Sequence, residues 1–313
     1  MSAAENLPTP RRQGRIRLMG NPVILKELRG RMRGARAFVV LTLYLLLMCG
    51  FMLLMYVLAA SARDLNGYTT GGQIGRTLFL GIVGIELFLV TFIAPALTAG
   101  AISGERERQT YDLVRTTLLP AHSLITGKLI AALSYVMLLL LAAIPLQSIA
   151  FLFGGVTEAE VALATVILIV TAILLGAVGV YASAITQRTI SANITAYGYT
   201  LGVIIGFPLV AFVLVGLFGS RVGLIPLQWQ TILLYLLLAM VVTNPLATAY
   251  ATQTWLLQTG SAGYFTQTLT DPVTGISAQL PVISPWILFT ILYLSLAVYF
   301  VVKAVRRVRR VEG

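Results

Sequence analysis

The chain has few of the residues that carry chemistry in enzymes and metal sites. Among its 313 residues are one cysteine, Cys49, and one histidine, His122. A single cysteine cannot form a disulfide within the chain. One histidine cannot supply the ligand set of a metalloprotease or the buried Ser–His pair of an intramembrane serine protease. We therefore expect no catalytic residue, no metal site and no enzyme activity in this chain.

Charged residues are also scarce, at 11% of the chain, whereas hydrophobic residues reach 58% and the mean hydropathy is +0.90. A soluble domain carries about a quarter charged residues. Apolar runs of about 20 residues, separated by short loops, are typical of helices that cross a bilayer. The alternating ten-residue segments of a transmembrane barrel do not occur in the sequence. The composition predicts an all-α integral membrane protein.

Six apolar runs are predicted to cross the membrane, and they lie at 37–60, 77–102, 127–153, 161–185, 195–218 and 285–302. A further apolar segment, 228–249, is ambiguous, because counting it as a crossing would put the two basic ends of the chain on opposite sides. We expect it to form a re-entrant or broken helix before the last span. Asn244-Pro245 is the expected break, since proline removes a backbone donor and disfavours helix at the preceding residue.

The net charge of +11 is concentrated in a few clusters. Nine Lys and Arg residues fall in 11–36 and five in 303–310. Such clusters at alternate ends of the spans follow the positive-inside rule and attract anionic lipid headgroups. They lack interleaved aromatic residues, so nucleic acid is not an expected partner. We expect a multi-pass protein of the cell membrane (inner or plasma), with both termini in the cytoplasm.

The amino-terminal segment 1–36 is predicted to hold a cytosolic tail and an amphipathic helix that lies at the membrane interface over 22–35. Asn21 is a good helix cap, and Pro22 suits the first helical position. Apolar residues would share one face of this helix, with basic residues around the rest. A plain basic flank without a partner is the alternative.

A charged island at 103–117 separates the second and third spans. If the island forms a helix, its opposite charges lie three or four residues apart, where they can pair. The pairs are Glu105 with Arg108, Arg108 with Asp112, and Asp112 with Arg115. Such pairs stabilise a helix by only a few tenths of a kcal/mol, about 0.2–0.5 each. We therefore interpret the island as a charged docking face, and an ordinary salt-bridged loop is the alternative.

Glu86 is the single acidic residue inside a predicted span. A charge at mid-bilayer costs about 2.5–3.5 kcal/mol on insertion scales. We therefore expect Glu86 to be neutral, paired, or facing a wet cavity, and Gln147 on the third span is the candidate hydrogen-bond partner. Both a residue of a translocation path and a simple contact between helices fit this pattern.

The run APALTAGAISGERERQTYDLVRTTLLPAHSLITGKL, from Ala94 to Leu129, resembles the signature region of ABC transporter permeases of the type-2 (exporter-like) class. The matching residues are Ser103, Gly104, Glu105, Arg106, Glu107, Thr110, Leu113, Thr116, Thr117, Gly127 and Lys128. The amino-terminal interfacial helix of the family is similar to the segment that holds Asn21, Pro22, Lys26, Glu27, Leu28 and Arg29. Two positions depart from the pattern: Gln109 stands where glycine is usual, and Leu118 where proline is usual.

This resemblance implies a membrane subunit that works with a separate cytoplasmic ATPase. The family's loop between the second and third spans, here 103–126, seats in a groove of that ATPase together with the interfacial helix. The coupling residues implied are Glu105, Arg106, Glu107, Arg108, Thr110, Asp112 and Arg115. The chain has no G-x-x-x-x-G-K-[ST] loop, so ATP and Mg would bind the partner.

The resemblance also implies a transmembrane permease domain over 37–302, a basic cytosolic tail over 303–313, and a dimer with a second copy or a sibling chain. Two other functions stay open. A scaffold or maturation-system subunit would recruit an ATPase without transporting a small molecule, and the sequence does not separate it from an exporter. An ion-coupled carrier would want more ionisable groups at mid-membrane than Glu86, and no clear internal repeat supports it.

Overall fold

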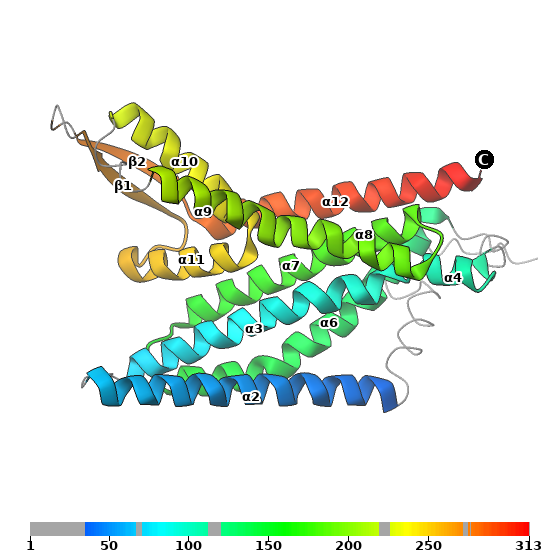
Figure 1. Ribbon diagram of the computed structural model, residues 1–313, viewed down its shortest axis with the longest axis horizontal. Coiled ribbons are helices and arrows are strands. Elements are labelled where there is room, and N and C mark those ends of the chain that lie inside the picture. Colours follow the sequence, from blue (N-terminus) through cyan, green and yellow to red (C-terminus); the bar gives the residue numbers. More distant parts are fainter. Residues whose placement is uncertain are drawn as a thin grey trace, which may run out of the picture.

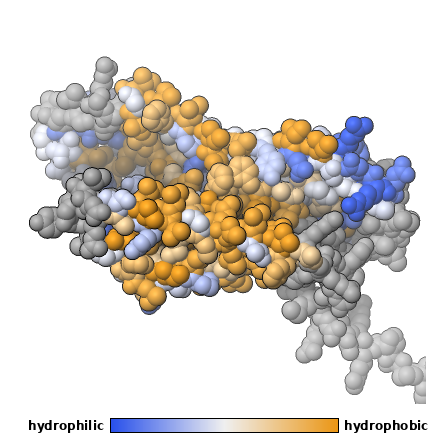
Figure 2. Space-filling view, turned by 60° about the horizontal axis from the view of Figure 1, so that its bottom comes forward, coloured by the Kyte–Doolittle hydropathy of each residue, from blue (hydrophilic) through white to orange (hydrophobic). Residues whose placement is uncertain are grey.

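The computed structural model describes residues 35–66, 71–111, 120–218, 226–271, 275 and 277–312. Within them, six helices are long and apolar enough to cross a membrane, and the prediction of an all-α membrane protein is confirmed. The long helices lie side by side, and the start of the first span lies at the same end of the bundle as the carboxyl terminus (Figure 1). Apolar side chains cover the middle of the surface, while hydrophilic ones gather at that end (Figure 2).

The six spans overlap the six predicted runs. They are α2 (Ala35–Asn66), α3 (Gly71–Ala99), α6 (Ala121–Leu152), α7 (Glu158–Ile185), a fifth span made of α8 (Thr189–Leu201), a π-helical turn (Gly202–Gly206) and α9 (Phe207–Phe218), and α12 (Pro285–Glu312). The predicted interfacial helix with Asn21, Pro22, Lys26, Glu27 and Arg29 lies outside the described residues, as do Asp112 and Arg115.

The central helix of the bundle is α7, which packs against α3, α6, α11 and α12. Its approach to α3 depends on Gly179, where an added Cβ would run into the Thr98 side chain and come within 3.1 Å of the Pro95 carbonyl oxygen. Small residues allow such close packing between membrane helices, where no hydrophobic effect drives helices together. By contrast, within an apolar stretch of 18 residues only 11% of the residues of the first span and 6% of those of the fifth span are buried, so these two lie at the periphery.

The predicted break before the last span is confirmed. Helix α10 (Leu227–Thr243) ends at Asn244, and α11 (Pro245–Thr259) begins directly after it. The backbone of Asn244 is extended, its Oδ1 accepts a hydrogen bond from the Ala247 amide at 3.0 Å, and its Nδ2 donates to the Ile204 carbonyl at 2.8 Å. One side chain thus caps α11 and joins it to the fifth span. Helix α10 runs into the bundle, and α11 returns toward the same end (Figure 1).

A small hairpin, which the sequence analysis did not predict, lies between α11 and α12. Strand β1 (Tyr264–Thr270) pairs antiparallel with β2 (Ser277–Ile283). Phe265 and Val282, which face each other across the two strands, are buried, and the Phe265 ring lies 4.5 Å from that of Trp255 on α11. The hairpin also contacts α10, where the Tyr235 hydroxyl donates to the Pro281 carbonyl at 3.1 Å, and it lies at the end of the bundle opposite the basic terminus (Figure 1).

Candidate functional site

The charged island follows α3 at the basic end of the bundle (Figure 1). Its first part is a short helix, which is followed by a turn. Helix α4 (Ser103–Glu107) is only five residues long. The chain then turns through Gln109, whose φ of 57° lies in the left-handed region that favours glycine. The island therefore does not form one continuous helix, because a left-handed residue ends an α-helix. This is also the position at which glycine is usual in the family that the sequence resembles.

The central contact of this site joins α4 to α6. Lys128 of α6 is only 4% exposed, and its Nζ donates to the Glu105 Oε1 at 2.6 Å and to the Ala101 carbonyl at 2.6 Å. Among the side chains that the structure describes, Glu105 pairs with Lys128 and not with Arg108. The ion pair that was expected along the helix is thus replaced by a pair between two helices. A buried ammonium requires a charged partner, and α4 supplies it.

Ser183 of α7 joins the start of α4 to the centre of the bundle. Its Oγ accepts hydrogen bonds from the backbone amides of Ile102 and Ser103, both at 2.9 Å, and lies 3.2 Å from the Ser103 Oγ. The first amides of a helix have no partner within the helix itself. A side chain from another span thus does the work of a helix cap.

Arg106 extends the attachment to the end of α7. Its Nη1 donates to the carbonyl oxygens of Ala184 at 3.1 Å and Thr186 at 3.0 Å, and its guanidinium lies 5.0 Å from the centre of the Tyr111 ring. The last carbonyls of a helix are unpaired and carry the negative end of the helix dipole. A cation at this position therefore satisfies both the hydrogen bonds and the charge.

Glu107 holds the start of the fifth span. Its Oε2 accepts a hydrogen bond from the Thr189 Oγ1 at 2.6 Å and from the Thr189 amide at 3.3 Å. These bonds, with smaller contributions from Arg188 and Arg108, hold the pKa of the Glu107 carboxyl below its ordinary value. The carboxylate also faces the first turn of α8, where the helix dipole favours a negative charge. The side chain remains exposed to solvent.

The predicted coupling residues therefore divide into two groups. Glu105 and Arg106 point inward and bind α6 and α7, whereas Glu107, Arg108 and Thr110 lie at the exposed surface. Sequence reasoning missed the partners Lys128, Ser183 and Thr189 as site residues. Lys128 carried a usable signal, because a lysine at the start of an apolar span needs an acceptor. Nothing in the sequence marked the other two.

The two intramembrane polar residues meet as expected. Gln147 of α6 donates from its Nε2 to both carboxyl oxygens of Glu86 on α3, at 3.1 and 2.8 Å. Glu86 is fully buried and lines a cavity of about 60 Å³ together with Thr165 of α7. Most of the lining side chains are apolar, but Glu86, Gln147 and Thr165 offer polar groups, and the cavity is roomy enough for water. The pair lies about 20 Å along α3 from Ala99, at 1.5 Å per residue, so it is separate from α4.

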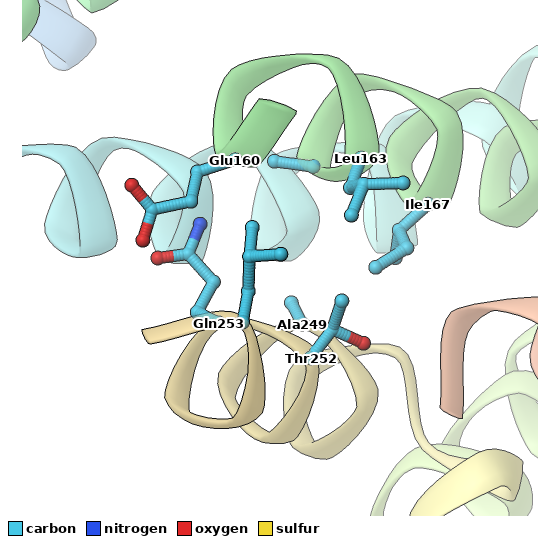
Figure 3. Close-up of a pocket in the computed structure, with 8 residues that line it drawn as sticks. Glu160, Leu163, Ile167, Ala249, Thr252 and Gln253 are labelled. Atoms are coloured by element: carbon cyan, nitrogen blue, oxygen red, sulfur yellow. The ribbon is translucent and has the colours of Figure 1, made fainter. Parts of the chain in front are cut away.

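A third group of polar side chains lies at the opposite end of α7, where Glu160 contacts α3 and faces α11. Glu160 forms a capping box with Thr157, and its Oε1 lies 3.7 Å from the Arg76 Nη2. Figure 3 shows Gln253 of α11 extending toward the Glu160 carboxyl group, beside Thr252. Glu160, Thr252 and Gln253 line a cavity of only about 10 Å³. The T-x-x-E spacing was the sequence signal for the cap.

No family model matches the chain, and no curated protein matches it in a sequence search. The six apolar helices fit a membrane transport protein in general. A more specific function rests on the motif around α4 and on the contacts that α4 makes.

Proposed function

We propose that the chain is the membrane-spanning permease subunit of an ABC transporter, in which a separate cytoplasmic ATPase drives substrate export. The observation that carries this proposal is the attachment of α4 to three spans. Hydrogen bonds of 2.6–3.3 Å join this short charged helix to α6, α7 and α8. Bonds of this kind are strong because a charged group takes part in most of them. A force on α4 would therefore reach all three spans together.

The exposed side of the island is the surface offered to the ATPase. Glu107 and Arg108 present charges of both signs beside Thr110, and the chain continues toward Asp112 and Arg115. ATP and Mg would bind the partner, whose closure would move α4 and the spans attached to it as a rigid body. In the cell membrane this arrangement places α4 and both termini in the cytoplasm, as the basic clusters favour.

One copy provides only half of a pathway in this proposal. The first and fifth spans are the least buried, and apolar side chains such as Leu46 and Phe212 are 66% and 77% exposed. In a bilayer such faces meet either lipid or a second membrane protein. We therefore propose a dimer with a second copy or a sibling chain, with one ATPase for each.

An ion-coupled carrier is a second candidate because of Glu86. A buried carboxyl group beside a water-sized cavity is typical of ion and proton pathways. Replacement of Glu86 by Gln would abolish coupling in a carrier. In an ATPase-driven exporter it would leave stimulation of the ATPase by substrate in place.

The test uses Arg108→Glu, which reverses an exposed charge and leaves the hydrogen bonds of Glu105, Arg106 and Glu107 intact. The chain is co-expressed with a candidate ABC ATPase, and co-purification and ATPase rate are measured. We expect both to fall at least tenfold, whereas Arg309→Glu, on an exposed residue of α12, leaves them unchanged. Equal behaviour of the two variants would refute docking at the island. Substrate uptake into inverted vesicles then separates an exporter from a scaffold, which would show none.

A further inference from the structure

Two neighbouring hollows lie between α7 and α12 in the half of the bundle that ends in basic residues. The first has a volume of about 360 Å³ and is lined by Tyr181, Ile185, Lys303, Arg306 and Arg307. The second has a volume of about 240 Å³, and its walls are mainly apolar and aromatic side chains of α7, α12 and the fifth span, with Thr200 and Thr243 beside them. One hollow is therefore lined by cations, and the other is mainly apolar.

An aromatic cluster joins the two hollows. Tyr181 lines the cationic hollow, whereas Tyr199 and Phe300 line the apolar one. The Tyr181 ring lies 5.4 Å from that of Phe300 and 6.5 Å from that of Tyr199. Because these rings touch, the hollows share a wall and follow one another along the two helices.

The combined length of the hollows matches one leaflet of a bilayer. On α7 they extend from Leu174 to Ile185, which is about 16 Å at 1.5 Å per residue. Half of a hydrocarbon core of about 30 Å is about 15 Å. A molecule that fills both hollows would therefore reach from the charged edge of the membrane to near its midplane.

The three cations lie on one side of α12, because residues three and four positions apart share a helix face. No ion pair joins Lys303, Arg306 or Arg307 to any carboxylate whose side chain the structure describes. The Lys303 Nζ lies over the ring of Tyr299 at 4.6 Å. Arginine presents a planar fork that matches phosphate oxygens, and lysine adds a compact charge. The set is suited to a phosphate group.

We propose that the two hollows bind one anionic phospholipid, with its phosphate among Lys303, Arg306 and Arg307 and one acyl chain in the apolar hollow. Both parts are required: the cations select the headgroup, and the apolar hollow selects a lipid over a soluble phosphate. The lipid would join α12 to α7 and the fifth span, so bound lipid stabilises their packing. This site is independent of the proposed export function and does not involve α4.

The test is native mass spectrometry of the full chain in detergent, titrated with dioleoylphosphatidylglycerol, with phosphatidylcholine of the same acyl chains, and with glycerol phosphate. We expect saturable binding of one phosphatidylglycerol and at least tenfold weaker binding of the other two. Arg306→Gln should weaken phosphatidylglycerol binding about fivefold, at about 1 kcal/mol per cation near the surface. Arg309→Gln removes the same charge from the same helix outside the hollow and should change little.

A second variant addresses the acyl chain. Leu296→Trp enlarges a partly exposed side chain that lines the apolar hollow, and it should weaken phosphatidylglycerol binding without affecting glycerol phosphate. The proposal is overturned if phosphatidylcholine or glycerol phosphate binds as tightly as phosphatidylglycerol. It is equally overturned if Arg309→Gln acts as strongly as Arg306→Gln, which would indicate diffuse attraction to the basic tail, or if Leu296→Trp has no effect.

Discussion

Replacement of Lys128 by methionine tests whether the contact between α4 and α6 holds the basic end of the bundle together. Methionine keeps most of the apolar stem and removes the ammonium group with its bonds to Glu105 and Ala101. The Glu105 carboxylate would lose its cation, and its Oε2 already lacks a hydrogen-bond partner among the described residues. Loss of one member of a buried ion pair costs about 3–5 kcal/mol. Because the Glu105 side chain is 23% exposed, we expect the lower end, about 3 kcal/mol.

Substitution of the partner, Glu105, distinguishes a direct ion pair from two independent effects. Glu105→Gln alone leaves the buried ammonium with only the Ala101 carbonyl of the two acceptors above, so it should also be destabilising. In the double variant neither charge is present, and part of the loss should return. Groups in direct contact show coupling energies of about 0.5–3 kcal/mol, and we expect more than 1 kcal/mol here.

The assay is the free energy of unfolding of the purified chain in mixed micelles, obtained by titration with a denaturing detergent. Arg108→Met, which removes an exposed cation from the same segment, should stay within about 0.5 kcal/mol of the unaltered chain. Effects that simply add in the double variant would refute a direct pair. A Lys128→Met protein as stable as the Arg108→Met control would refute the structural role of the contact.

Three further predictions each concern a single feature of the bundle. Gln109→Gly should stabilise the chain by about 0.5–1 kcal/mol in the same titration, because a non-glycine residue with left-handed backbone costs about 1–2 kcal/mol; Gln109→Ala should not. Gly179→Ala should cost about 1–3 kcal/mol through overpacking against α3, whereas Gly84→Ala, whose added Cβ meets nothing within 4 Å, should not destabilise. The lowered pKa of Glu107 means that its bond to the Thr189 amide is present above the ordinary value of 4.5 and is lost as the pH falls through the lowered value. Hydrogen exchange at the Thr189 amide should rise there, and Thr189→Val, which removes the stronger hydroxyl bond, should move this rise to higher pH.

The spans and the broken helix were predictable because each depends on signals within a short stretch of sequence. A run of apolar residues long enough to cross a bilayer has few alternatives to a spanning helix. Asn244-Pro245 carried two local signals at once, since asparagine caps helices and proline suits the first turn. The helices extend several residues beyond some predicted runs, as at Ala121, because polar residues can continue a helix past the apolar core.

The contacts of α4 were not predictable in the same way. Ser183 and Thr189 lie about 80 residues from the groups they bind, and serine and threonine are too common in spans to signal a role. The same limit applies to Glu105, whose nearest sequence candidate was Arg108. Helix periodicity favoured that pair, and both residues do lie at α4, but the carboxylate meets Lys128 of α6 instead. Glu105 pairs with Lys128 because an unpaired ammonium costs more free energy when it is buried than an unpaired guanidinium does when it is exposed.

The polar contacts are distributed unequally along α7, and this bears on how the bundle would move. At the basic end, Ser183 and the carbonyl of Ala184 bind α4 at 2.9–3.1 Å. At the other end, Glu160 meets Arg76 at 3.7 Å and faces α11 across a small cavity. The longer contact is the weaker one, because electrostatic attraction and hydrogen bonding both decline with distance. A force applied through α4 would therefore break the contact between Glu160 of α7 and Arg76 of α3 before it breaks the bonds between α4 and α7, and the proposed ATPase would act at one end of the bundle to loosen the other.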